Sequence, residues 1–157
     1  MKGYIILLKS YLDEDGVLQE AIEQVPHNGN IGLKKLYELI GCDIVDVKET
    51  QPAGYNLMST CVMLPAMTLV FDDEFLLKTD NPQANRLASV LNGYPWRHSQ
   101  CLCGNVVICD STEDGEMVPF DEEATAKIVS GLEKLYAEAV DHIKFKVQQF
   151  EWHVEAF

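Results

Sequence analysis

Short apolar runs recur along this chain, some of them with alternating polar positions, and each run is bounded by polar or turn residues. Such runs predict β-strands at 4–9, 17–25, 43–48, 58–64, 67–71 and 102–109. Asp13-Glu14-Asp15-Gly16 lies between the first two runs and predicts a hairpin turn. Pro65 predicts a sheet edge or a bulge, and 51–56, which contains a proline and a glycine, predicts a loop.

Helical spacing of apolar residues replaces the alternation in three segments. It predicts helices over 33–40, over 83–91 and from 121 onward. We expect Asn30 to cap the first helix and Gly41 to end it in the left-handed conformation. Asp121 is a good N-cap for the last helix, because two glutamates follow it at the positive end of the helix dipole.

The last helix carries an apolar stripe with heptad-like spacing. About thirty residues of helix span ~50 Å, which is longer than one small sheet can cover. Either the helix breaks within 141–146, or its end packs on another subunit. Exposed apolar stripes usually mark an interface, so we expect a homo-oligomer, a two-fold dimer first of all. The stripe consists of Tyr136, Ala139, Val140, Ile143, Val147, Phe150, Val154 and Phe157.

The order of these elements predicts an α+β fold. We expect a central mixed or antiparallel β-sheet with packed helices and a long C-terminal helix. The sheet should contain the runs at Tyr4, Ile44, Leu69 and Val106, and the helices at Leu33 and Asn85 should lie on it. The 157 residues suit one domain, with a core over 1–130 and a helical extension over 131–157.

Composition narrows the possible partners. The net charge is −13, so nucleic acid and anionic membranes are improbable partners of the bulk surface. No apolar run reaches the roughly 18 residues of a membrane helix, and the N-terminal run is too short for a signal peptide. We therefore expect a cytoplasmic protein whose five cysteines are reduced thiols.

The basic residues are unevenly distributed. The window 78–98 holds three basic residues and one acid, and it contains both arginines of the chain, Arg86 and Arg97. Arginine suits phosphate or carboxylate, and neighbouring aromatic rings suit stacking on a flat ligand. Alternatively, the aromatic residues pack the helix onto the sheet and both arginines pair with surplus acids. The predicted ligand-binding residues are Asn81, Asn85, Arg86, Tyr94, Trp96 and Arg97.

Catalytic and metal-binding motifs are not recognisable. His98, Cys101 and Cys103 invite comparison with zinc sites, but one residue between two cysteines gives an awkward chelate. Buried structural cysteines explain this spacing better. The acidic groups at 72–74 and 110–115 lack the register of a calcium loop and suit turns. We expect no catalytic residue, no metal and no cofactor.

Several blocks together resemble one family. They are Asn85-Arg86-Leu87-Ala88-Ser89, Gly104-Asn105-Val106-Val107-Ile108 and Phe120-Asp121-Glu122-Glu123, with earlier blocks at 36–47 and 69–74. Over residues 1–130 the chain resembles the DUF3846 family, which has no assigned function and is frequent in phages and bacterial mobile elements. The resemblance implies a small accessory protein that counters host defence, and it transfers no catalytic residue.

These observations predict a non-enzymatic accessory protein that binds and sequesters a small anionic, nucleotide-derived signalling molecule. The alternative is an acidic protein-interaction module or DNA mimic that inhibits a host restriction or defence protein. A mimic needs carboxylates in rows at phosphate-like spacing, whereas the acids here cluster in turns. A metal-dependent or cysteine enzyme would need a convergent cluster that the sequence does not show.

Overall fold

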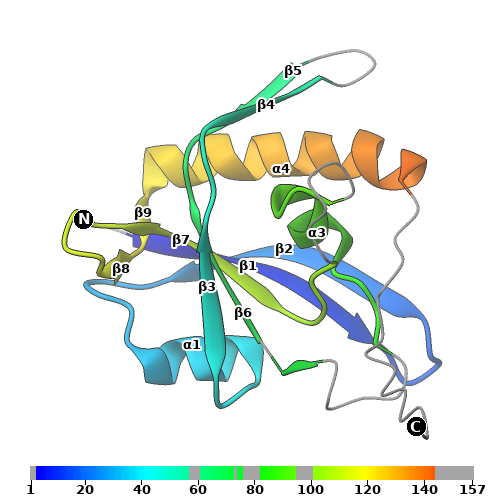
Figure 1. Cartoon of the computed structure of the whole chain (residues 1–157), viewed down its shortest axis with the longest axis horizontal. Coiled ribbons are helices and arrows are strands. Elements are labelled where there is room, and N and C mark those ends of the chain that lie inside the picture. Colours follow the sequence, from blue (N-terminus) through cyan, green and yellow to red (C-terminus); the bar gives the residue numbers. More distant parts are fainter. Residues whose placement is uncertain (1–2, 57–60, 73, 76–81, 95–100, 144–157) are drawn as a thin grey trace, which may run out of the picture.

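The structure is a computed structural model that describes residues 3–56, 61–72, 74–75, 82–94 and 101–143, with 139–142 described as backbone only. Its main sheet has the strand order β2-β1-β7-β6-β3, and all neighbours in this order are antiparallel (Figure 1). These strands are β1 (Gly3–Leu12), β2 (Leu18–Pro26), β3 (Val45–Glu49), β6 (Thr68–Asp72) and β7 (Val106–Ser111). Two short strands extend it, β8 (Met117–Val118) on β7 and β9 (Phe120–Asp121) on β1.

The helices cover both faces of this sheet. They are α1 (Leu33–Ile40), α3 (Arg86–Leu91) and α4 (Glu122–His142). Alternate residues of β1 explain the layers: Ile5 and Leu7 pack with α1, whereas Ile6 and Leu8 pack with α3 and α4. The predicted α+β class is confirmed, and all four predicted runs lie in the sheet, which is antiparallel.

Two of the three predicted helix caps, Gly41 and Asp121, are confirmed. Gly41 ends α1 with φ 79°, and its N–H donates to Tyr37 O over 2.8 Å, as predicted. Asp121 caps α4, because its carboxylate accepts from the Ala124 N–H over 2.7 Å. The prediction that Asn30 caps α1 is wrong. The N-cap is Gly32, without a side-chain cap, and the Asn30 amide donates instead to the Glu116 carboxylate.

The predicted loop over 51–56 is also wrong in part, because residues 53–56 form a strand. This strand, β4 (Ala53–Asn56), pairs with β5 (Cys61–Leu64). The pairing continues the register of β3 and β6: Glu49 faces Thr68 in the sheet, and Ala53 faces Leu64 beyond it. In that register the two prolines, Pro52 and Pro65, lie opposite each other. Neither has an N–H to donate, so the ladder is interrupted there.

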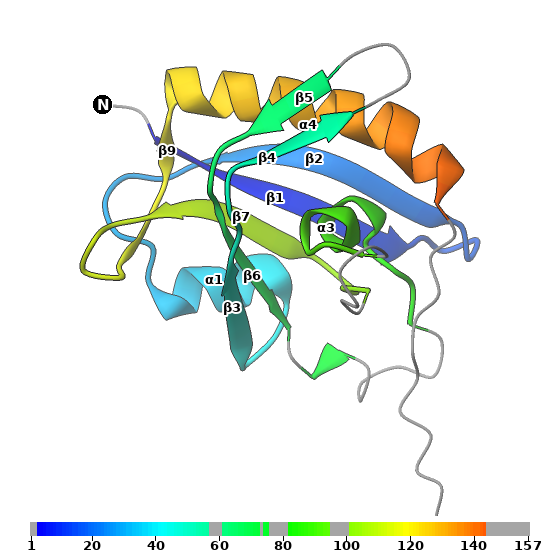
Figure 2. The same cartoon turned by 45° about the horizontal axis from the view of Figure 1, so that its top comes forward.

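We call β4 and β5 together the β-arm. Figure 2 shows the β-arm leaving the sheet and crossing α4. Val62 and Leu64 are buried against α4, while Cys61 and Met63 point outward and are exposed. Gly131 of α4 makes this approach possible. A Cβ there would lie 3.0 Å from Leu64 Cδ2 and 3.1 Å from Val62 Cγ1.

The last helix stops earlier than its apolar stripe. α4 ends at His142, and Ile143 has extended backbone angles, φ −111° and ψ 131°. This agrees with the predicted break within 141–146. Tyr136 and Ile143 pack on the core of the chain itself, whereas the stripe beyond Ile143 lies outside the described residues. The oligomer therefore stays a prediction. No described helix combines the length and apolar character needed to cross a membrane.

A larger side chain at Gly131 should loosen the β-arm. We expect Gly131→Val to lower the free energy of unfolding by ~1–3 kcal/mol, because the added methyl groups overpack the contact with Val62 and Leu64. Urea denaturation measures the change. Ser130→Val is the matched control, since it puts the same side chain on an exposed position of the same helix. Equal losses for both variants would show that the β-arm contact is not responsible, because helix propensity by itself favours valine over glycine at position 131.

Candidate functional site

Asn85 and Arg86 begin α3, where the sequence predicted a ligand site. Asn85 is buried, and all its side-chain polar groups are used within the fold. Its Oδ1 accepts from the Ala88 N–H over 3.2 Å, and its Nδ2 donates to Leu8 O and Gly104 O over 3.0 and 2.8 Å. Asn85 therefore ties α3 to β1 and to the segment before β7.

Arg86 forms a network with two residues that are distant in the sequence. Its Nε donates to Glu20 Oε1 over 2.7 Å, and its Nη2 donates to the same oxygen. Tyr136 OH donates to Glu20 Oε1 over 2.9 Å and accepts from Arg86 Nη2 over 3.1 Å. The Arg86 backbone N–H reaches Glu20 Oε2 over 3.3 Å. This Glu20–Arg86–Tyr136 network joins β2, α3 and α4.

Burial sets the electrostatics of the network. The Glu20 side chain is 7% exposed and that of Arg86 is 33% exposed. The hydrogen bond that Arg86 donates to Glu20 raises the pKa of Arg86, which stays charged. Burial first, and the hydrogen bond to Glu20 second, raise the pKa of Tyr136, so its hydroxyl keeps its proton. Of the two alternatives that the sequence left open, pairing with an acid describes Arg86.

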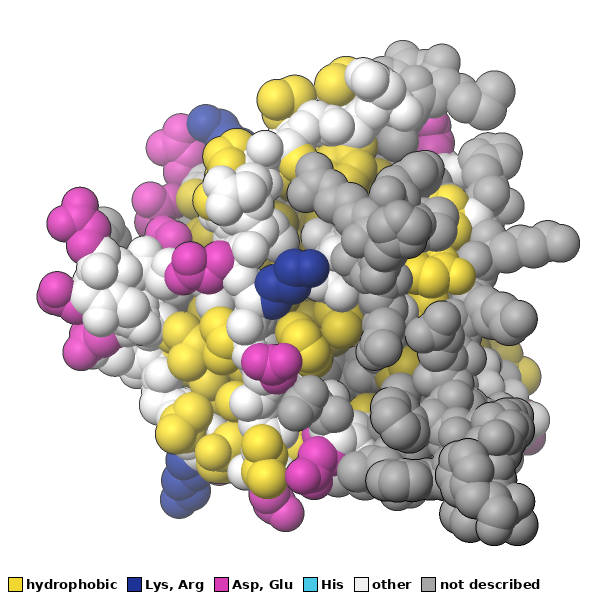
Figure 3. Space-filling view, in the orientation of Figure 1, with side chains coloured by type: hydrophobic (Ala, Val, Ile, Leu, Met, Phe, Trp, Pro, Cys, Tyr) yellow, Lys and Arg dark blue, Asp and Glu magenta, His cyan; other side chains and the backbone are white. Residues whose placement is uncertain are grey.

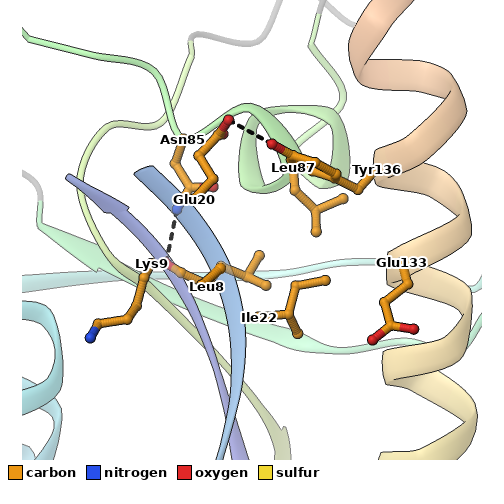
Figure 4. Close-up of a pocket in the computed structure, with 9 residues that line it drawn as sticks. Leu8, Lys9, Glu20, Ile22, Asn85, Leu87, Glu133 and Tyr136 are labelled. Carbon is orange, nitrogen blue, oxygen red and sulfur yellow. Dashed lines mark hydrogen bonds between the residues drawn. The ribbon is translucent and has the colours of Figure 1, made fainter. Parts of the chain in front are cut away.

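A pocket of about 200 Å³ lies beside the network. Figure 4 shows apolar side chains along one side of it, and the hydrogen bond between Glu20 and Tyr136 at its upper end. It is larger than the ~150 Å³ cavity that accepts benzene in another protein, so one ring-sized group fits. The lining residues are Leu8, Lys9, Glu20, Ala21, Ile22, Asn85, Leu87, Glu133 and Tyr136.

The other predicted site residues are not brought to this pocket within the described part of the chain. Tyr94 is partly buried, and its backbone N–H donates to Ser89 O over 3.0 Å. It does not line the pocket. Asn81, Trp96 and Arg97 lie outside the described residues. Their roles, and the ligand contacts of Asn85, Arg86 and Tyr94, stay predictions.

The cysteines of the suspected zinc spacing, and Cys109 after them, are buried and form no disulfide. Cys101, Cys103 and Cys109 have small exposed fractions. Burial raises the pKa of Cys103 to about 12, and burial likewise raises the pKa of Cys109 to about 12. Both side chains are thiols at neutral pH, and a thiol is a poor nucleophile. Over the residues that the structure describes, no three His, Cys, Asp or Glu side chains converge as metal ligands would.

Comparison with known proteins adds no relative. No protein-family model, curated protein or solved structure matches this chain. The resemblance to the DUF3846 family stays a prediction that rests on the residue blocks given above.

Removing the Arg86 side chain should leave the buried Glu20 carboxylate without its cationic partner. We expect Arg86→Ala to cost ~2–4 kcal/mol of stability, somewhat less than a fully buried pair because the Arg86 side chain is one-third exposed. Denaturant unfolding measures this. Lys127→Ala removes a cation from an exposed pair with Glu123 and should cost at most ~0.5 kcal/mol.

A double variant separates the ion pair from the packing of the arginine side chain. Adding Glu20→Gln to Arg86→Ala removes the stranded charge, so part of the lost stability should return. If the double variant loses the sum of the two single losses, the two side chains do not interact energetically.

The thiols should differ in reactivity. Cys61 is exposed on the β-arm, whereas Cys103 and Cys109 are buried and have pKa values of about 12. We expect iodoacetamide at neutral pH to modify Cys61 about tenfold faster than Cys103 or Cys109 in the folded protein. Peptide mass spectrometry over time measures the rates, and the denatured protein serves as the control in which all thiols react. Equal rates in the folded protein would contradict the burial of Cys103 and Cys109.

Proposed function

We propose that this protein is a non-enzymatic binding protein that holds a small molecule in the pocket bounded by β1, β2, α3 and α4. The observation that carries the proposal is the pocket itself, which has an apolar wall and a polar end. Leu8, Ile22 and Leu87 form the apolar wall, and the Glu20–Arg86–Tyr136 network fixes the polar end. A concave apolar site with few, fixed polar groups is typical of small-molecule sites.

An anionic part of the ligand would contact Arg86 beside the pocket. The Nε and Nη2 atoms of Arg86 are used by Glu20 and Tyr136, but Nη1 has no hydrogen bond to any described residue. With a side chain 33% exposed, Arg86 can offer the two N–H groups of Nη1 to a phosphate or carboxylate. The proposed ligand is a small anionic, nucleotide-derived signalling molecule.

The biological setting follows from the DUF3846 resemblance. A phage or mobile-element protein that binds such a signal in the bacterial cytoplasm would lower its free concentration and so counter host defence. Sequestration needs affinity and no chemical step, so it is compatible with the buried, protonated thiols of Cys103 and Cys109. This role is a proposal for the whole chain.

The acidic surface favours a second candidate, an acidic protein-interaction module. Figure 3 shows acidic side chains gathered at the end of the molecule that carries β8, β9 and the start of α4. Glu122 and Glu123 begin α4 there, and the acidic turn before β8 adds Glu113 and Asp114. This grouping would suit a basic surface on a host defence protein. It is a cluster around turns and a helix start, which supports a DNA mimic less well.

Native mass spectrometry of the protein purified from infected or defence-active cells tests the first candidate. We expect a bound small molecule in the wild type and its loss in Ile22→Trp, because the larger ring fills the pocket. Val17→Trp places the same ring on an exposed turn position and should keep the ligand. The same spectra report the subunit count.

Two results would contradict the proposal. If the wild type carries no small molecule, or if Ile22→Trp and Val17→Trp retain it equally, the pocket is not the binding site. Co-purification of a basic host protein in place of a small molecule would favour the acidic interaction module.

A further inference from the structure

We infer that the pocket beside the Glu20–Arg86–Tyr136 network selects a ring that carries hydrogen-bond donors, such as an amidine or an amino-substituted heterocycle. The inference rests on the proposed function and names the chemistry of the ligand part that enters the pocket. It follows from which hydrogen-bond donors and acceptors of the lining residues already form hydrogen bonds within the protein.

The hydrogen-bond acceptors that line the pocket can still accept further hydrogen bonds. Glu20 Oε1 already takes three donors, from Arg86 Nε, Arg86 Nη2 and Tyr136 OH. The other oxygen, Oε2, takes only the Arg86 backbone N–H over 3.3 Å. An ionised carboxylate has about four lone-pair sites, so Oε2 can accept a further donor. Glu133 of α4 adds a second carboxylate to the lining; it is exposed and lies at the other end of the pocket from Glu20 in Figure 4.

The donors of the pocket are, by contrast, occupied. Both N–H groups of the Asn85 amide go to Leu8 O and Gly104 O. The Tyr136 hydroxyl proton goes to Glu20. Lys9 points away from the pocket in Figure 4, and its Nζ lies 3.3 Å from Glu23 Oε1.

A ligand therefore meets the buried carboxylate of Glu20 at the upper end of the pocket in Figure 4 and the exposed carboxylate of Glu133 at the other end, with apolar side chains between them. A ligand acceptor placed against Glu20 would lose its hydrogen bonds to water without replacement, and an anion would also be repelled. A ligand donor gains a charge-assisted hydrogen bond there. The pocket thus discriminates by hydrogen-bond polarity.

This polarity is compatible with an anionic ligand of nucleotide type. The amino edge of adenine, cytosine or guanine presents N–H donors on a ring, which is the pattern that the pocket accepts. Arg86 bonds to Glu20 and Tyr136 but does not line the pocket, so a phosphate bound by Arg86 would lie outside the pocket. Ring and phosphate are thereby separated by the network.

Three benzene derivatives of nearly equal shape test the inference: benzamidine, acetophenone and benzoate. They carry, respectively, donors, a neutral acceptor and an anion on the same ring. Amide chemical shifts of the full-length protein, measured by NMR during titration, report binding at Ile22 and Leu87. We expect benzamidine to bind about tenfold more tightly than acetophenone, as one charge-assisted hydrogen bond would give, and benzoate to bind most weakly.

A variant pair checks that the selectivity comes from the pocket. Glu133→Gln should weaken benzamidine binding about threefold to tenfold, whereas Glu122→Gln makes the same charge change on the same helix about 16 Å away and should leave it unchanged. Equal effects of both variants would show general attraction to an acidic protein and would overturn the inference.

The outcomes separate the inference from the function on which it rests. Equal binding of the three probes at Ile22 and Leu87, or tightest binding of benzoate, overturns donor selection but leaves a small-molecule pocket. Absence of shift changes at these residues with all three probes at millimolar concentration overturns the pocket as a binding site, and the inference with it.

Discussion

The carboxylate of Glu20 is the one side-chain group that hydrogen bonds to both α3 and α4 from β2, among the residues that the structure describes. Among the described strands, β2 pairs with β1 alone, so its second backbone edge makes no strand contact there. Glu20 anchors β2 by accepting from Arg86 and Tyr136, each on a different helix. Because the Glu20 side chain is only 7% exposed, its charge is tolerated in this position through these donors.

The fold was largely predictable because its strands and helix ends have local causes. Alternation in β1 separates two cores, and Gly41 and Asp121 end and begin helices through contacts within a few residues. The β4 strand was missed because proline and glycine at 52 and 54 indicate a loop. β4 pairs with β5 because the register of β3 and β6 continues past the opposed prolines. This pairing depends on residues distant in the sequence, so the local pattern at 51–56 does not indicate it.

The site was predictable only in part, for the same reason. Arg86 was found because the chain has only two arginines. Its partners Glu20 and Tyr136 lie 66 and 50 residues away, and Glu20 is one of 25 acidic residues, so nothing in its neighbourhood distinguishes it. Asn85 was selected for its amide, and within the fold this amide caps α3 and donates to two carbonyl groups, a structural role that the sequence did not indicate.

The position of α4 connects this packing to binding. α4 supplies Tyr136 and Glu133 to the pocket, and it is packed on both sides, by the sheet through Leu132 and Leu135 and by the β-arm through Val62 and Leu64. A helix held in this way keeps the backbone positions of its pocket residues fixed, so less of the interaction energy with the proposed ligand would be consumed by ordering the helix. The contact at Gly131 is remote from the pocket, yet it would contribute to the affinity for the proposed ligand by holding the helix that forms the pocket's wall.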